Sequence, residues 1–298
     1  MIKTNIEFLR DPFAIERDGV YYVYGTGVDN DDWDNTVWTC YKNTSGKLDG
    51  EWVKVGAVAE MPEWATKNRW APEVHLYNGE YYLFGSYYSE KTGRKGCAVF
   101  KADSPEGPFT EISNGHVNPS HMECIDGTLY VDEEGTPWMI FVHEWNHTDD
   151  GVGRMCAAKM SHDLTHFTSD VITLFRANEP VWAEKDSFVT DGCFMYKCKT
   201  GELLMLWSNF NADGYCVGVA RSDNGKVDGN WSHDESLLFS KGLSGEHGGG
   251  HGMIFKDVDG KTYLCLHTPN HPSPEGGERT VFVPIYEENG SLVTVFDK

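Results

Sequence analysis

Five stretches of the chain repeat the same order of polar and apolar positions. Each has a small or polar residue, a short apolar run, a polar turn with glycine, and a second run of bulky apolar residues. Two apolar runs separated by a glycine-containing turn predict a β-hairpin. The five stretches read RDPFAIERDGVYYVYG from Arg10, WAPEVHLYNGEYYLFG from Trp70, CIDGTLYVDEEGTPWMIF from Cys124, VTDGCFMYKCKTGELLMLW from Val189 and GHGMIFKDVDGKTYLCLH from Gly250.

The hairpins recur at a nearly constant interval. Their turn glycines lie between 56 and 66 residues apart, at Gly19, Gly79, Gly135, Gly201 and Gly260. Two further short strands follow most hairpins, as in VWTCYKNTSGKLDGEW from Val37 and VGVARSDNGKVDGNW from Val217. Four strands repeated five times are typical of a five-bladed β-propeller with four antiparallel strands in each blade. Because no long helical stripe and no linker interrupts the pattern, we expect an all-β fold and a single domain over residues 1–298.

In a propeller the first strand of each blade lines the central channel. The polar residues that begin the five hairpins, here called the heads, should therefore meet at one end of that channel. Carboxylates brought together in this way repel one another, which costs free energy and raises the pKa of at least one of them. If the aspartates only capped the ends of strands, the fold would not need to bring their charges together. Two carboxylates across a pocket are what glycoside hydrolysis needs, and a third can keep the acid protonated. The expected heads are Asp11, Glu73 (or Pro72 with one gap), Asp126, Asp191 and His251.

Three tryptophans are candidates for stacking on the face of a sugar: Trp33, Trp70 and Trp145. Each is also compatible with a place in the core. Trp70 is the best candidate because it directly precedes a strand that should line the channel.

The motifs RDPF, WAPEVH, CIDGTLY, VTDGCFMY and GGHGMIF resemble, in the same order, those of glycoside hydrolase family 43. The resemblance covers nearly the whole chain and implies a five-bladed propeller enzyme. It implies inverting hydrolysis of α-L-arabinofuranosides or β-D-xylosides, with galactoside-directed activity as an alternative. The substrate would be a plant-type oligosaccharide, and no cofactor is required.

The resemblance also implies roles for the three aspartates. Asp11 matches the general base, and Asp126 matches the residue that orients the acid and raises its pKa. Asp191 matches the general acid, although most members have Glu-Gly-Pro where this chain reads Asp-Gly-Cys. Arg10 lies beside the base, and strand alternation predicts that its side chain points away from the channel.

Two further residues take roles from the same resemblance. His251 matches a channel histidine that lies near a structural calcium ion, commonly through water. Arg279 resembles a late arginine that binds substrate.

Composition narrows the classes of partner and compartment. The chain has 46 acidic and 25 basic residues and a net charge of −21, so it should repel phosphate backbones and anionic headgroups. We therefore expect neither a nucleic-acid nor a membrane partner. The eight cysteines form no CxxC pair and mostly lie in apolar runs. Together with an N-terminus that lacks the pattern of a signal peptide, they predict a cytoplasmic protein. The oligomeric state stays open.

Two other functions are compatible with a propeller. One is a carbohydrate-binding protein that has lost catalysis, and the other is a scaffold for protein partners. An acid cluster has no use in a scaffold, and all three carboxylate positions are filled, which favours an enzyme.

Overall fold

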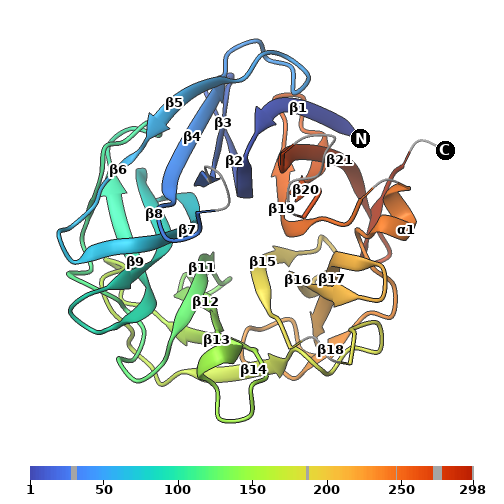
Figure 1. The fold of residues 1–298 in the computed structure, drawn as a ribbon. Coiled ribbons are helices and arrows are strands. Elements are labelled where there is room, and N and C mark those ends of the chain that lie inside the picture. The colour runs from blue at the N-terminus through green and yellow to red at the C-terminus, as the bar shows by residue number, and fades with distance from the viewer. Residues whose placement is uncertain (28–31, 186–187, 246, 271–276, 297–298) are drawn as a thin grey trace.

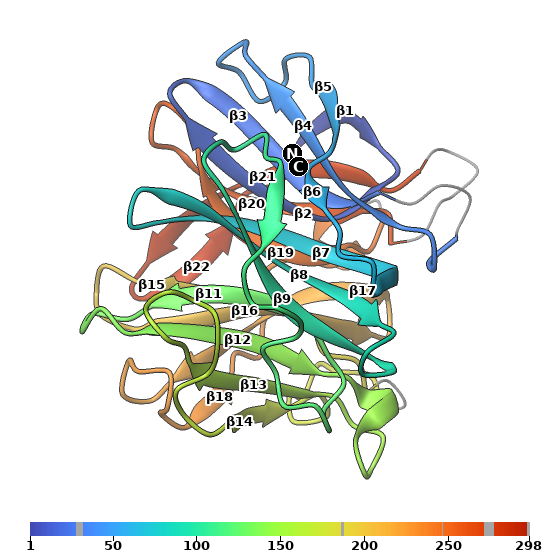
Figure 2. The ribbon, with the colours of Figure 1, turned by 90° about the vertical axis from the view of Figure 1, so that its left-hand side faces the viewer.

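The five predicted hairpins each begin an antiparallel sheet, and the sheets stand around a central channel as a five-bladed β-propeller (Figures 1 and 2). The computed structural model describes residues 1–27, 32–185, 188–245, 247–270 and 277–296. The turn glycines have positive φ angles, from 76° at Gly260 to 102° at Gly201, as hairpin turns require. The predicted all-β fold, blade number and strand count per blade are confirmed.

The blades follow the order of the sequence. Blade 1 contains β2 (Leu9–Arg17), β3 (Val20–Gly27), β4 (Val37–Asn43) and β5 (Val53–Ala57). Blade 2 contains β7 (Ala65–Tyr77), β8 (Glu80–Ser89), β9 (Arg94–Ala102) and β10 (Phe109–Glu111), with β6 (Ala59–Glu60) parallel to β10. Blade 3 contains β11 (Cys124–Val131), β12 (Pro137–His143), β13 (Arg154–Lys159) and β14 (Ile172–Arg176). Blade 4 contains β15 (Asp191–Lys197), β16 (Leu203–Asn211), β17 (Gly214–Ser222) and β18 (Trp231–His233).

The ring is closed by the N-terminal strand. Blade 5 contains β19 (Gly250–Lys256), β20 (Thr262–Thr268) and β21 (Arg279–Glu288), and its outer strand is β1 (Ile2–Glu7). A short strand, β22 (Ser291–Thr294), also pairs with β21. Figure 1 shows β1, in dark blue, beside β21, in red. Both ends of the chain therefore belong to one sheet, so the first and last blades cannot separate without breaking its hydrogen bonds.

Large apolar side chains fill the space between neighbouring blades. Trp38 of β4 packs edge-on against Phe100 of β9, with ring centroids 5.0 Å apart. Phe175 of β14 packs against Trp207 of β16 at 5.1 Å. All eight cysteines are free and buried. No helix in the described part of the chain is long and apolar enough to span a bilayer.

The innermost strand of every blade carries a β-bulge at the same place. The pairing with the second strand is interrupted after Arg10, Trp70, Ile125, Asp191 and Gly250. The next residue has a positive φ, between 46° and 55°, at Asp11, Ala71, Asp126, Gly192 and His251. These five residues are the true structural equivalents. The expected alignment was therefore wrong by one residue in blade 4 and by one or two in blade 2.

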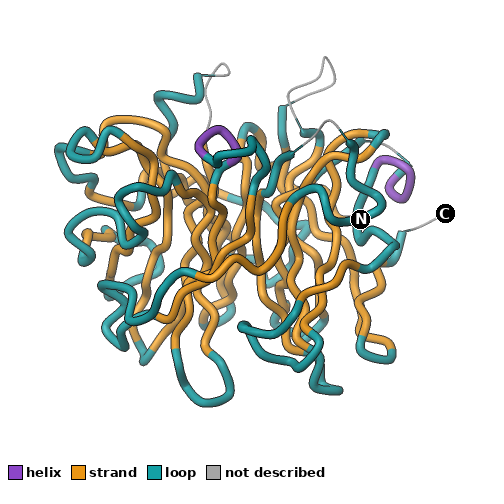
Figure 3. Tube along the Cα trace, turned by 90° about the horizontal axis from the view of Figure 1, so that it is seen from below, coloured by secondary structure: helices purple, strands orange, loops and turns teal. Residues whose placement is uncertain are grey.

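Two short helical turns lie at the same end of the ring (Figure 3). They are the 3-10 turn η1 (Trp145–His147) and α1 (Lys241–Ser244). α1 is capped by the Ser240 side chain, which accepts a hydrogen bond from the Leu243 N–H. η1 matters for function because its first residue, Trp145, reaches the pocket described next.

Candidate active site

A pocket of about 260 Å³ opens where the five innermost strands begin. Seven of the residues expected from the sequence line it: Asp11, Asp126, Asp191, His251, Trp33, Trp70 and Trp145. Arg10, Ile125 and Glu144 complete its wall. The carboxylates and the tryptophans that were chosen from separate parts of the chain thus meet in one place.

Asp11 is held as a carboxylate. Its Oδ2 accepts a hydrogen bond of 2.7 Å from the Thr26 hydroxyl, and its Oδ1 lies 3.2 Å from His251 Nδ1. Burial alone would raise the pKa of Asp11, but His251 and then Arg10 hold it well below its usual range. Burial alone would likewise lower the pKa of His251, but Asp11 and Asp126 raise it to about 10. At neutral pH the pair is therefore a carboxylate and an imidazolium.

A second histidine fixes the backbone of the same residue. The Asp11 N–H donates to His267 Nδ1 at 3.2 Å. Burial and the nearby Arg10 lower the pKa of His267 to about 3, so this ring is neutral. Because Nδ1 accepts, the proton sits on Nε2, which lies 3.3 Å from Asn270 Oδ1.

Asp126 and Asp191 form a pair that cannot easily carry two charges. The Asp126 carboxyl is buried, accepts a 3.0 Å hydrogen bond from the Gly192 N–H, and lies 3.8 Å from His251 Nδ1. Burial raises the pKa of both carboxyls, and the Asp126 charge raises that of Asp191 further. At Asp126 the second largest influence, His251, lowers the pKa, whereas at Asp191 the two largest influences, burial and Asp126, both raise it. His251 and then the Tyr215 hydroxyl, at 3.0 Å, lower the pKa of Asp191 in part. The shared proton is therefore favoured on Asp191.

Hydrogen bonds between blades hold the bulges in register. In four blades the bulge N–H donates to a side chain on the second strand of the preceding blade. The pairs are Ala71 with Thr26, Asp126 with Ser86, His251 with Ser208 and Asp11 with His267. Blade 3 has Val142 at the corresponding place, which cannot accept, and Asp126 Oδ2 takes the Gly192 N–H instead. Asp126, the candidate pKa-modulating residue, therefore also links blades 3 and 4 through this hydrogen bond.

Arg10 lies in the pocket wall, so the expectation that it points away from the channel was wrong. Its guanidinium bonds to Glu278 and to Asn270 Oδ1 and lies 4.7 Å from the centre of the Trp33 ring. The reason is the bulge that begins directly after Arg10, because a bulge with a left-handed residue breaks the alternation of side chains.

Two expected site residues lie elsewhere. Glu73 follows the bulge of its strand and is buried beside His75, whose Nε2 lies 3.1 Å from its carboxylate. Arg279 begins β21, the third strand from the channel, and forms an ion pair with Glu7. Neither lines the pocket of the three aspartates.

The sequence reasoning missed Tyr215 and Glu144. Tyr215 belongs to β17, which is the third strand of its blade, and no local motif marks it. Glu144 directly precedes Trp145, which the sequence marked as a candidate for sugar stacking. Its position beside that tryptophan could have identified it as a residue of the pocket.

The residues present do not fit direct binding of a metal ion. Among the described residues, no three or more His, Cys, Asp or Glu side chains are grouped to bind one. An imidazolium at His251 has no lone pair to offer. Its Nε2 is buried and makes no hydrogen bond with another described residue.

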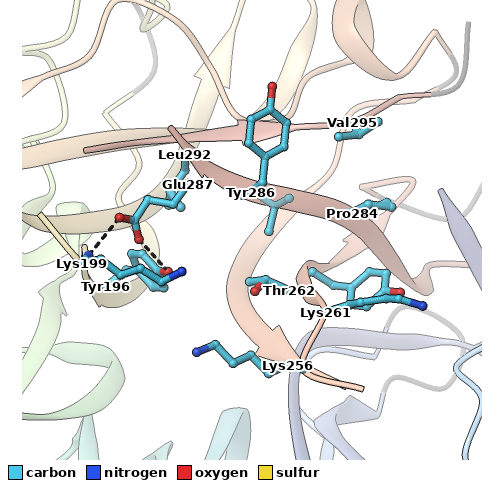
Figure 4. Close-up of a pocket in the computed structure, with 13 residues that line it drawn as sticks. Tyr196, Lys199, Lys256, Lys261, Thr262, Pro284, Tyr286, Glu287, Leu292 and Val295 are labelled. Atoms are coloured by element: carbon cyan, nitrogen blue, oxygen red, sulfur yellow. Dashed lines mark hydrogen bonds between the residues drawn. The ribbon is translucent and has the colours of Figure 1, made fainter. Parts of the chain in front are cut away.

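A larger groove, of about 510 Å³, lies on another part of the ring (Figure 4). Of the described residues that line it, only Glu287 carries a carboxylate. That carboxylate accepts hydrogen bonds from the Tyr196 hydroxyl at 3.3 Å and the Lys199 N–H at 2.9 Å. The second carboxylate that acid–base hydrolysis of glycosides requires is not among the described residues that line this groove.

Comparison with known proteins identifies the family. The model of glycosyl hydrolases family 43 matches residues 6–291. The chain belongs to this family. Each of the five motifs found in the sequence contributes a residue to the pocket, and three of them contribute its aspartates, Asp11, Asp126 and Asp191.

Several proteins of known structure or named activity are similar to the chain. The crystal structure of an endo-arabinase from Bacteroides thetaiotaomicron is 34% identical, with a TM-score of 0.82, and the match covers 97% of this chain and 98% of that one. The extracellular endo-α-(1→5)-L-arabinanase 1 of Bacillus subtilis is 28% identical over 47% of this chain. Xylosidase/arabinosidase 43A of Humicola insolens is 30% identical over 48% of it. Each of these two matches spans 45% of the curated relative, which is less than half its length.

Proposed function

We propose that the protein is an inverting glycoside hydrolase that releases α-L-arabinofuranosyl or β-D-xylosyl residues from oligosaccharides. The observation that carries the proposal is the meeting of Asp11, Asp126 and Asp191 in one pocket, where the surroundings shift their pKa values in opposite directions. The surroundings hold the pKa of Asp11 low and that of Asp191 high. An ionised base and a protonated acid are the two groups that single-displacement hydrolysis needs.

In the proposed mechanism, Asp11 takes a proton from a water molecule while the water oxygen bonds to the anomeric carbon. The glycosidic bond breaks, and Asp191 gives its proton to the leaving oxygen. Asp126 takes no part in the proton transfers and keeps Asp191 protonated until the sugar is bound. The reaction leaves Asp11 protonated and Asp191 ionised, and exchange with solvent restores both. Trp33, Trp70 and Trp145 offer ring faces to the sugar.

Arabinofuranosides are the preferred substrates. This preference is supported by the endo-arabinase from Bacteroides thetaiotaomicron, which is similar over almost the whole chain, and by the arabinanase from Bacillus subtilis. β-D-Xylosides are an alternative, because a named relative is a xylosidase/arabinosidase. Galactosides are a further alternative within the family.

The test is turnover of 4-nitrophenyl α-L-arabinofuranoside, β-D-xylopyranoside and β-D-galactopyranoside, with the product followed by proton NMR during early turnover. We expect the first product to have the anomeric configuration opposite to that of the substrate, and Asp11→Asn to abolish turnover. A first product with the substrate's own configuration would remove Asp11 from the role of base. Binding without hydrolysis of any glycoside would favour the non-catalytic carbohydrate-binding propeller.

The proposal includes no required cofactor. A calcium ion in the channel would meet His251 through water, because its nitrogens are not arranged to bind a metal directly. The partner is an oligosaccharide, and the net charge of −21 argues against nucleic-acid and membrane partners. Eight buried free cysteines support a cytoplasmic location, where thiols stay reduced.

A further inference from the structure

The pocket wall near Trp70 and Trp145 holds an ion pair that the proposed hydrolysis does not use. Lys95 Nζ lies 2.7 Å from Glu144 Oε1 and 2.6 Å from Glu144 Oε2. The two side chains are only 13% and 4% exposed. Removing two charges from water costs free energy that a well-packed apolar pair would not, so stability does not explain the pair.

The surroundings of the pair fix its position. Glu144 connects β12 to η1, and its N–H donates to the Glu123 carbonyl at 3.0 Å. Lys95 Nζ also lies 3.6 Å from the Glu123 carboxylate and 4.7 Å from the centre of the Trp70 ring. Lys95 therefore joins the glutamate of blade 3 to a tryptophan of blade 2, both of which line the pocket.

The carboxylate of Glu144 has acceptor capacity left. A carboxylate has about four lone-pair sites. From the described residues, Oε1 accepts a single hydrogen bond, that of Lys95, whereas Oε2 is buried against the same ammonium at 2.6 Å. Because a carboxylate has no hydrogen to give, its partner in the pocket must be a donor. The donors that a neutral sugar offers are its hydroxyl groups, and a hydrogen bond to a charged acceptor is stronger than one between neutral groups.

We propose that Glu144 is a specificity-determining residue that accepts a hydrogen bond from one hydroxyl of the bound sugar, and that Lys95 positions it. The inference rests on the proposed function, because it requires that the pocket bind a neutral sugar. It adds a fourth carboxylate to the site, with a role in recognition and none in proton transfer.

The test measures binding, so that it does not depend on turnover. Trp33, Trp70 and Trp145 line the pocket, and their fluorescence reports sugar binding. The probes are L-arabinose, D-xylose and D-galactose, each with its set of monodeoxy derivatives. Glu144→Gln should weaken binding of the preferred sugar by about 10- to 100-fold. The derivative that lacks the contacted hydroxyl should bind the wild type and Glu144→Gln equally, which marks the two groups as partners.

Lys95 is tested by two variants and a matched control. Lys95→Arg keeps the cation and should retain the difference in binding affinity between the parent sugar and the derivative that lacks the contacted hydroxyl. Lys95→Met leaves a buried carboxylate without its cation, so the midpoint of thermal unfolding should fall. The difference in affinity between the parent sugar and the derivative should vanish. Lys101→Met is the control, because Lys101 lies on the same strand and pairs with Glu80 at 2.7 Å on the surface. It should leave sugar binding unchanged.

The outcomes separate this inference from the proposed function. If no neutral sugar binds, or if every derivative responds to Glu144→Gln as the parent sugar does, the role of Glu144 is refuted. If the sugar and its derivative show the expected coupling but no glycoside is hydrolysed, the role of Glu144 stands and the proposed hydrolysis fails.

Discussion

Replacing Gly192 by alanine tests whether the contact between blades 4 and 5 sets the position of His251. Gly192 has a φ of 53°, and an alanine Cβ there would lie 2.7 Å from both Cα and Cγ of His251. A left-handed φ alone does not demand glycine at this position. The equivalent residues of the other blades, Asp11, Ala71, Asp126 and His251, carry side chains at φ angles of 46° to 55°. The demand for glycine comes from the neighbouring histidine.

The expected cost has two parts. A left-handed conformation costs a residue with a Cβ about 1–2 kcal/mol. Forcing a methyl group into a packed site costs about 1–3 kcal/mol. One close contact is with the His251 backbone, which cannot rotate away, so both parts should apply and the free energy of unfolding should fall by about 2–5 kcal/mol. Displacement of His251 from Asp11 should also lower turnover by at least about tenfold, since the imidazolium stabilises the carboxylate of Asp11, the proposed base.

Urea unfolding of Gly192→Ala and of a control, Gly46→Ala, measures the difference. Gly46 has a φ of 72°, and a Cβ there would have no other atom within 4 Å. The control should therefore show only the backbone cost of about 1–2 kcal/mol. If Gly192→Ala loses no more stability than Gly46→Ala, the contact with His251 does not constrain the site and the reasoning is refuted.

Three substitutions test the proposed role of Asp191 as the general acid. Asp191→Asn should slow the hydrolysis of glycosides with poor leaving groups by about 100-fold or more. It should slow the hydrolysis of activated aryl glycosides much less, because their leaving groups need no protonation. Equal losses of kcat for the two kinds of substrate would contradict the acid role. Asp126→Asn removes a charge that, with burial, raises the Asp191 pKa, so the alkaline limb of kcat/KM should move to lower pH. Tyr215→Phe removes a hydrogen bond that lowers the same pKa, so that limb should move to higher pH, and shifts of equal sign in these two variants would refute the assignment.

The sequence was sufficient for the blades because each hairpin carries its own signal. The turn glycines that marked the five units all adopt positive φ angles. The closure of the ring was not predictable in this way. β1 reads IKTNIE, has no turn of its own, and pairs with residues near position 280. Its place depends on contacts between the two ends of the chain, which no local pattern encodes.

The site was predictable in its members but not in its geometry. Asp11, Asp126 and His251 came together because they occupy equivalent bulges of three blades. Arg10 was assigned to the wrong face because the argument assumed an unbroken alternation of side chains. A bulge is a long-range feature that depends on the register of the neighbouring strand, so the sequence of one strand does not reveal it.

The bulges also explain why the candidate acid stands one position earlier than the other two carboxylates. The bulge position in blade 4 faces His251 so closely that even a methyl group would collide with it. An aspartate there would have to displace the histidine that pairs with Asp11. Glycine at this position leaves the histidine in place, and the preceding residue, Asp191, supplies the carboxyl instead, bonded to Tyr215. One repeated backbone therefore yields an asymmetric pocket, because each blade constrains what its neighbour can carry.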